Sequence, residues 1–318
     1  MRSQPLARSS YRDAVAVSRP QDAHAGHDRP ALHTRAPLST LSSVLCSAAV
    51  AVLLSACSAA LPAPETTQNT PAAPLAAVPS SSPAHTAFDA ARLQSLLPAD
   101  VLLLGERHDA PDHQRLQRDV VAWLAARGQL AAVVMEMAER GHSTSGLPPN
   151  ASEAQVQAAL QWNNAAWPWA TYREVVMAAV AAGVPVLGGN LPRADMRSAM
   201  SGAHWDQHLP TAALQQQYTA LREGHCGLLP ESQIAPMARI QIARDASMAQ
   251  AVQSALQPGK TVLLVAGGGH VLRTVGVPTH WPFGLTSKVA LAQTDKALAA
   301  IESEADWVIE QAGQSHLN

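Results

Sequence analysis

The stretch that decides the fold is VLLLGERHDAPDHQRLQRDVVAWL, residues 101–124. Four aliphatic residues, Val101–Leu104, run directly into a glycine and four ionisable residues, and a helical pattern begins near Asp112. A continuous apolar run of this kind is typical of a strand that is covered on both faces. Such a strand does not need a glutamate, an arginine and a histidine at its tip. Residues 105–109 are therefore a candidate for part of a functional site.

The alternation of a short apolar run and a longer helical pattern repeats along the rest of the chain. This rhythm predicts an α/β domain with a mostly parallel sheet flanked by helices. The long, mostly helical interval between the third and fourth strands predicts a smaller helical lobe around 192–256. The predicted strands are 101–104, 131–135, 184–187, 261–266 and 288–291, and the predicted helices are about 112–126, 170–182, 211–222 and 236–256.

The composition supports a folded protein with a large core. The chain has 318 residues, of which 47% are hydrophobic and 14% charged, and its formal net charge is −2. The hydrophobic fraction argues against general disorder. A nearly neutral chain lacks the basic surface on which nucleic-acid binding depends, so no nucleic-acid partner is expected.

A lipid anchor is predicted near the N-terminus. The apolar run at 41–56 has the length of the hydrophobic region of a secretory signal and is too short to cross a bilayer comfortably. It ends in LSAC, which resembles the bacterial lipobox, so Cys57 is the predicted lipidation site. A signal cleaved near Ala56 or Ala59 without lipidation is the alternative.

The rest of the N-terminal region sets the expected domain boundaries. Residues 1–56 form the signal segment, residues 57–86 are rich in Pro and Ala and predict a disordered tether, and the folded body covers 87–318. The chain before the apolar run is long for a signal, which favours a translation start downstream of Met1; a long n-region is the alternative. Ser58 resembles the sorting signal for the outer membrane, so the expected location is the bacterial cell envelope.

Polar residues follow four of the predicted strands at the point where each strand ends. In an open parallel sheet, ligands bind beyond the carboxyl ends of the strands, so residues far apart in the sequence are expected to meet there. The sequence therefore predicts one shared cleft at this edge. The residues are Glu106 and His108 after the first strand, Glu136 after the second, Asn190 and Arg193 after the third, and His270 after the fourth.

The body of the chain resembles the ChaN family of haem-binding lipoproteins, within a wider group that includes Tiki proteases and erythromycin esterases. The resemblance covers roughly residues 102–278. It is carried by the paired G-x-x-H motifs GERH and GGGH, and by the segments VVMEMAERG, WPWATYREVVMAAVAAGVPVLGGNLPR, GHCGLLP and ARIQIARDASMAQAV. The family resemblance implies a lipid-anchored envelope protein that binds haem and serves iron uptake. It also implies a homodimer, and a haem receptor or transporter as further partner.

The residues at the strand ends also allow a different chemistry. Two carboxylates and two imidazoles suit a divalent metal that activates water. Within the wider group, the resemblance to Tiki proteases implies metal-dependent hydrolysis through the G-x-x-H histidines. The resemblance to the esterases implies a histidine general base aided by a glutamate. No G-x-S-x-G motif is present in the sequence, and no nucleophile can be paired with a base. The candidate metal ligands and catalytic residues are Glu106, His108, Glu136 and His270.

Haem binding requires an apolar slot, a ligand for iron and cations for two propionates. Indole faces can stack on a porphyrin, although the same tryptophans can instead pack the lobe against the sheet. A tyrosine phenolate suits ferric iron, and an ordinary core or surface tyrosine is the alternative. The candidates are Trp162, Trp167 and Trp169 for stacking, Tyr172, Tyr218, His225 and Cys226 for iron, and Arg193 and Arg222 for the propionates.

The leading prediction is thus a lipid-anchored haem-binding protein of the envelope that takes part in haem or iron uptake and is not an enzyme. A metal-dependent hydrolase is the second prediction. A structural envelope lipoprotein without catalytic function is the third.

Overall fold

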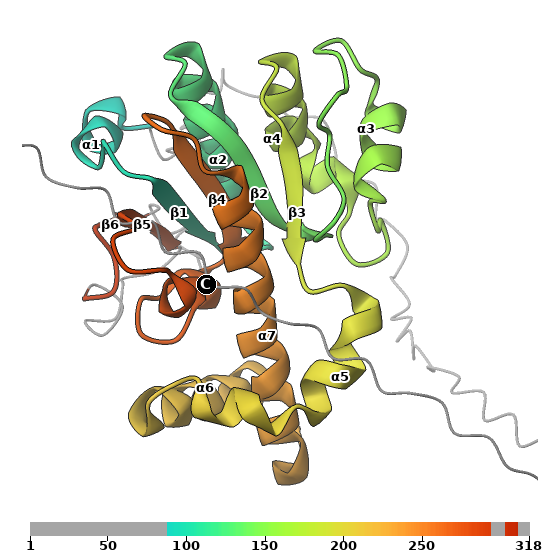
Figure 1. The fold of residues 1–318 in the computed structure, drawn as a ribbon, viewed down its shortest axis with the longest axis vertical. Coiled ribbons are helices and arrows are strands. Elements are labelled where there is room, and N and C mark those ends of the chain that lie inside the picture. Colours follow the sequence, from blue (N-terminus) through green and yellow to red (C-terminus); the bar gives the residue numbers. More distant parts are fainter. Residues whose placement is uncertain (1–87, 294–302, 311–318) are drawn as a thin grey trace, which may run out of the picture. The chain divides into compact units, whose positions relative to one another are not determined.

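The computed structural model describes residues 88–293 and 303–310, so the predicted signal segment, the tether and Cys57 lie outside the described residues. The described chain forms a six-stranded sheet in the order β3-β2-β4-β1-β5-β6 (Figure 1). Each neighbouring pair of strands is parallel, which confirms the α/β class. The strands are β1 (Val101–Glu106), β2 (Leu130–Glu139), β3 (Val186–Asn190), β4 (Thr261–Gly267), β5 (Ser287–Gln293) and β6 (Trp307–Glu310).

Seven α-helices and four short 3-10 helices accompany these strands in the described part of the chain. None of the helices among those residues is both long enough and apolar enough to cross a membrane. The α-helices are α1 (Ala90–Ser95), α2 (Pro111–Ala126), α3 (Glu153–Leu160), α4 (Trp169–Ala181), α5 (Met196–Ser201), α6 (Thr211–Gly224) and α7 (Glu231–Ala255). The 3-10 helices are η1 (Arg193–Asp195), η2 (Ala203–Gln207), η3 (Gly268–Val271) and η4 (Val277–His280).

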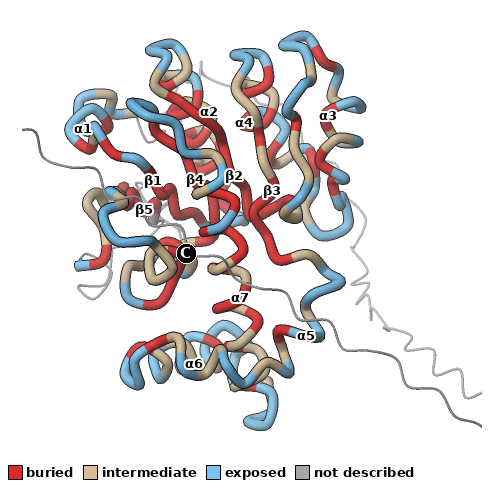
Figure 2. Tube along the Cα trace, viewed as in Figure 1, coloured by how far each residue is buried: buried red, intermediate tan, exposed pale blue. Residues whose placement is uncertain are grey.

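Helices cover both faces of the sheet, which explains the continuous apolar runs of its central strands. Side chains alternate between the two faces of a strand. In β1, Leu102 and Leu104 belong to the core shared with α2 and α4, whereas Val101 and Leu103 belong to the core shared with α7. All six residues of β1 and all seven of β4 are buried (Figure 2).

The helical lobe is built on the first half of α7. Ile234 and Ala238 of α7 pack with Leu221 of α6. The second half of the same helix reaches the sheet, where Met248 and Val252 join the core. Figure 1 shows α6 lying across the lower end of α7, beyond the edge of the sheet at which the strands end.

The observed elements differ from the predicted ones mainly at the edge of the sheet. Each predicted strand and helix overlaps an observed one, and β3 begins at Val186 rather than at residue 184. Strand β6 was not predicted, because it is only four residues long and pairs on one side with β5. The short helices α1, α3 and α5 were also not predicted.

Candidate functional site

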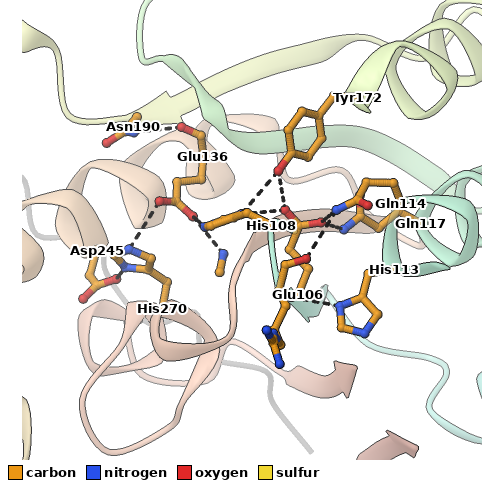
Figure 3. A network of polar contacts seen from close by, with 12 residues as sticks. Glu106, His108, His113, Gln114, Gln117, Glu136, Tyr172, Asn190, Asp245 and His270 are labelled. Carbon is orange, nitrogen blue, oxygen red and sulfur yellow. Dashed lines mark hydrogen bonds and ion pairs between the residues drawn. The ribbon is translucent and has the colours of Figure 1, made fainter. Parts of the chain in front are cut away.

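The carboxyl ends of β1, β2 and β4 bring the predicted acids and imidazoles together. Glu106 at the end of β1 is in register with Gly267 at the end of β4. Glu136 follows Met135, which is in register with Val265 of β4. Figure 3 shows that Glu106, His108, Glu136 and His270 form one network of polar contacts.

Glu106 is buried, and its carboxylate is surrounded by protein donors. Its Oε1 accepts from the hydroxyl of Tyr172 and from Nδ1 of His108, each at 2.7 Å. Its Oε2 accepts from Nε2 of Gln114 at 2.8 Å and from Nε2 of Gln117. Because each oxygen already receives two hydrogen bonds, Glu106 acts by orienting His108. Neither of the glutamines was singled out from the sequence, although both lie in the first turns of the helix that follows GERH.

His108 is the most accessible imidazole of the network. Its side chain is 38% exposed, and its Nε2 lies 3.8 Å from Oε2 of Glu136. Its ring makes an edge contact with Trp167, with 4.8 Å between ring centroids. Burial by itself lowers the pKa of His108, but the hydrogen bond with Glu106 and the charge of Glu136 raise it above its ordinary value.

Glu136 and His270 form the second half of the network. Glu136 accepts a hydrogen bond from the backbone N–H of Gly267 at 2.8 Å, and its Oε1 lies 3.5 Å from Nε2 of His270. Burial alone would raise the pKa of Glu136, but the neighbouring His270 and His108 lower it to about 2. Asn190 donates to the backbone carbonyl of Glu136 at 2.8 Å and so fixes the end of β2.

Asp245 holds the other side of the His270 ring. Its Oδ1 lies 2.6 Å from Nδ1 of His270. Burial opposes a charge on His270, but Asp245 and Glu136 together raise its pKa to about 10. Burial raises the pKa of Asp245 to about 6, despite the attraction of His270. At neutral pH the two groups are therefore an imidazolium and a carboxylate. The sequence offered one signal for this role, an aspartate among apolar residues in the middle of α7.

A cavity of about 770 Å³ separates this network from the helical lobe. That volume lies in the range of small-molecule and cofactor sites. One wall is formed by the residues at the strand ends, and the other by α6 and the segment that follows η3. The lining residues include Arg107, His108, Asp109, Gly267–Gly269 and His270 on the sheet side, and Gln217, Ala220, Leu221, Gly224, His225, Leu272 and Val275 on the lobe side.

Tyr172 does not fit its predicted role as an iron ligand. It is 1% exposed, and its hydroxyl donates to Glu106. Burial and the charge of Glu106 raise the pKa of Tyr172 far above its ordinary value, so the residue is a neutral phenol. Its place is inside the network, where it positions Glu106.

Two of the three tryptophans predicted for porphyrin stacking lie in the core instead. Nε1 of Trp162 donates to the backbone carbonyl of Trp167 at 2.8 Å, and Nε1 of Trp169 donates to Glu153 at 2.6 Å. Trp162 and Trp169 are 9% and 7% exposed. They pack α3 against α4, so the predicted role of Trp169 in haem binding does not hold. Trp167 is half-buried and covers one side of His108.

The remaining predicted residues lie in or near the lobe, and one of them lines the cavity. His225 directly follows α6 and contributes to the cavity wall. Tyr218 is half-buried at the contact between α6 and α7, outside the cavity lining. Arg193 on η1 is exposed, Arg222 on α6 is paired with Glu231, and neither is a lining residue.

The predicted metal site is not supported by the geometry. Within residues 88–293 and 303–310, no group of three or more His, Cys, Asp and Glu residues is arranged to hold a metal ion. The physical reason is that the ring nitrogens and carboxylates are already directed at one another. His108 is engaged by Glu106 and His270 by Asp245.

One solved structure supports the fold of this chain. A structure of ChaN of Campylobacter jejuni, described as showing cofacial heme binding, is 23% identical; the match covers 69% of this chain and 89% of that one, with a TM-score of 0.55. The type III effector HopBA1 is 14% identical over 67% of this chain and 88% of its own, with a TM-score of 0.36. No curated protein matches the chain. Residues 92–280 match the family described as "Haem-binding uptake, Tiki superfamily, ChaN", and the chain therefore belongs to that haem-binding uptake family.

Proposed function

We propose that this protein binds haem in the cavity between the sheet edge and α6. The observation that carries the proposal is the position of His225 in a cavity of the right size for a cofactor. Part of the wall around it is apolar, as a porphyrin requires. Ala220, Leu221, Leu272 and Val275 form this apolar part, next to Gln216, Gln217 and Gln241.

The geometry of His225 suits an iron ligand. Its Nδ1 lies 2.8 Å from the backbone carbonyl of Leu221, so Nδ1 carries the proton and donates. The lone pair then belongs to Nε2. A histidine that ligates a metal commonly donates its other ring N–H to a backbone carbonyl, which fixes the ring and its tautomer. His225 is exposed, so a ligand can reach it.

Tyr218 is the second candidate for iron, in a different arrangement. It lies on the α6–α7 face of the lobe and not in the cavity wall. The Campylobacter jejuni structure is described as one of cofacial haem binding by that protein. By analogy, the proposal includes a homodimer of this chain, with Tyr218 as the ligand if haem is held on the outer face of the lobe.

The cellular part of the proposal rests on the N-terminal sequence. A protein anchored through a lipid on Cys57, at the outer membrane, would present haem to a receptor or transporter during iron uptake. The tether at 57–86 would let the folded body move away from the membrane surface.

A haemin titration with three variants tests the proposal. The unchanged protein is expected to give a saturable shift of the Soret band. His225→Ala is expected to change the spectrum and weaken binding, whereas Tyr218→Phe leaves both as they are. His204→Ala is the matched control, because His204 is an exposed lobe histidine outside the cavity lining. If haemin binds no better than to an unrelated protein, the proposal is wrong. If Tyr218→Phe alone changes the spectrum, the haem lies outside the cavity.

A hydrolase is the second candidate, because Asp245 and His270 line the same cavity and Glu136 faces the other nitrogen of the His270 ring. In this arrangement one carboxylate orients an imidazole whose other nitrogen faces a second acid. Turnover in an esterase or peptidase screen that His270→Ala abolishes would support it. A protein that gives neither haemin binding nor turnover would be left with the structural role.

A further inference from the structure

We infer that Arg107 binds the propionate carboxylates of the haem, so that the macrocycle enters with its carboxylates toward the sheet edge. The inference rests on the proposed haem binding and adds an orientation and a charged subsite to it. Arg107 was not a candidate for this role in the sequence, where Arg193 and Arg222 were preferred.

The polarity of the cavity sets the orientation. The lobe wall carries aliphatic and glutamine side chains and, apart from His225, no ionisable group. The sheet wall carries the ionisable residues Glu106, Arg107, His108, Asp109, Asp245 and His270. Haem has the same asymmetry, with an apolar macrocycle and two carboxylates on one edge. Placing those carboxylates against the lobe wall would leave them without a positively charged side chain as partner, which is costly. The macrocycle therefore packs on the lobe side and the carboxylates face the strand ends.

The charges of the two sheet-side histidines are already balanced by buried acids. His270 lies between Asp245 and Glu136. His108 is bonded to Glu106 and also faces Glu136. A carboxylate that arrives from outside would compete with these acids at close range, so neither imidazolium is the best partner for it.

Arg107 differs because its carboxylate partner is exposed. Its Nε and Nη2 lie 3.2 and 3.1 Å from the two oxygens of Asp109. The side chains of the pair are 51% and 72% exposed. Exposed ion pairs contribute little stability, so the guanidinium can turn to a new carboxylate at low cost. The planar guanidinium also matches a carboxylate in a bidentate contact.

The backbone of Arg107 is held in place by a hydrogen bond, so its side chain extends from a fixed position at the edge of the cavity. Its N–H donates to Nδ1 of His113 at 2.9 Å. His113 is 1% exposed and belongs to α2. The arginine is thus anchored at its backbone while its charged end reaches the solvent-accessible edge of the cavity.

The two arginines preferred from the sequence are less suited. Arg193 is exposed and is not a lining residue of the cavity. Arg222 is in an exposed pair with Glu231, as Arg107 is with Asp109, but Arg222 is not a lining residue of the cavity. A matched comparison of Arg107→Gln with Arg193→Gln therefore separates the subsite from a general effect of lost positive charge.

The experiment uses the whole protein and three porphyrins: haemin, haemin dimethyl ester, and metal-free protoporphyrin IX. Binding is followed by the Soret band for the iron compounds and by quenching of tryptophan fluorescence for protoporphyrin IX. Arg107→Gln is expected to weaken haemin and protoporphyrin IX about tenfold, the loss of one charge-assisted hydrogen-bonded contact, and to leave the ester unchanged. Arg193→Gln is expected to change none of the three. His225→Ala is expected to weaken haemin but not protoporphyrin IX, because it acts through iron.

The results separate this inference from the proposed function. If the unchanged protein binds haemin and Arg107→Gln binds haemin and protoporphyrin IX equally tightly, the Arg107 subsite is wrong while haem binding stands. An equal loss for the ester and the free acids also overturns it, because the effect would then not pass through the carboxylates. If the unchanged protein does not bind haemin, both fail. Thermal melting of Arg107→Gln, which alters a half-exposed side chain, is expected to match the unchanged protein.

Discussion

The carboxylate of Asp245 lies 2.6 Å from Nδ1 of His270, so a residue in the middle of α7 fixes the ring that follows β4. This contact joins the helix that carries the lobe to the end of the sheet. It also surrounds one imidazole with two acids, because Glu136 faces the opposite nitrogen.

Replacing Asp245 with Ala is expected to lower the free energy of unfolding by about 3 kcal/mol, because it leaves a buried imidazolium with one of its two partners missing. Urea denaturation at pH 7 measures the change. Asp109→Asn is the control: it also removes one carboxylate, but from an exposed pair, and is expected to cost less than about 0.5 kcal/mol. Equal costs for the two variants would mean that the Asp245–His270 pair is not important for stability.

The stability of the unchanged protein is expected to fall as the pH rises from about 6.5 toward 10. The folded state raises the pKa of His270 from its ordinary 6.5 to about 10. The unfolded chain therefore loses this proton first, and the stabilisation is complete below 6.5 and gone above 10, with a slope of up to about 1.4 kcal/mol per pH unit. Urea midpoints between pH 6 and 10 measure it. Asp245→Asn is expected to flatten the curve, and an unchanged slope in that variant would contradict the assignment to His270.

The stability of the protein is also expected to fall at low pH, because of Glu136. Its pKa is lowered from 4.5 to about 2, so its contribution is complete above pH 4.5 and is lost as the pH falls through 2. Glu136→Gln is expected to remove that dependence, while Glu174→Gln, which alters a surface acid on α4, keeps it. Tryptophan fluorescence between pH 5 and 2 follows the transition. Identical acid profiles in the two variants would rule out Glu136 as its source.

Tyr172→Phe is expected to destabilise the fold by about 1–2 kcal/mol without altering the spectrum of bound haemin. The change removes a buried hydroxyl that donates to Glu106, and an acceptor that loses a buried partner is costly. Because the phenol is neutral and buried, it does not reach iron. A shifted ligand-to-metal band in this variant would contradict that conclusion.

Gly267 and Gly269 of the GGGH motif are expected to differ sharply in how well they tolerate a side chain. A Cβ at Gly267 would lie 2.9 Å from Nε2 of His108, whereas a Cβ at Gly269 would meet no atom within 4 Å. Gly267→Ala is thus expected to cost about 1–3 kcal/mol and to move the NMR signals of the His108 ring, because overpacking forces the imidazole aside. Gly269→Ala is the matched control and should leave both unchanged. Similar effects of the two would show that the close approach of His108 is not what excludes a side chain.

Cys57→Ser is expected to release the protein from the membrane fraction of its host, since it removes the predicted site of lipid attachment. Cys46→Ser, a change within the predicted signal, is the control and is expected to leave the mature protein anchored. Fractionation and the mass of the mature N-terminus provide the measurement. A Cys57→Ser protein that stays in the membrane fraction would favour the alternative without lipidation.

The sheet and the position of the site could be predicted because both follow from local patterns. Apolar runs identified β1 and β4, and the parallel direction then required Glu106, Glu136 and His270 to meet. The partner of each acid could not be predicted in the same way. Asp245 lies in a continuous helix, and only the rotation of α7 about its axis decides whether its carboxylate meets His270, a cleft arginine or solvent.

The residues proposed to contact haem were harder to predict than the partners of the acids, because the type of a residue does not reveal whether it is buried. Tyr172 and Trp169 have the chemistry of haem contacts, but both lie on the inner face of α4 and are used to build the core. Arg107 sits in the quoted motif itself and was passed over in favour of Arg193. Which arginine reaches a cavity depends on how the lobe folds back over the strand ends, and nothing local in the sequence encodes that.

One continuous helix, α7, connects the helical lobe to the sheet side of the cavity. Ile234 of α7 packs with the lobe, and Asp245 of the same helix holds the sheet-side imidazole. From position 234 to position 245 the helix rises about 16 Å, at about 1.5 Å per residue. The number of helical turns between these two residues therefore sets the distance between the lobe and the imidazole on the sheet side of the cavity. A homologue that gained or lost one turn there would be matched to a cargo about 5 Å longer or shorter.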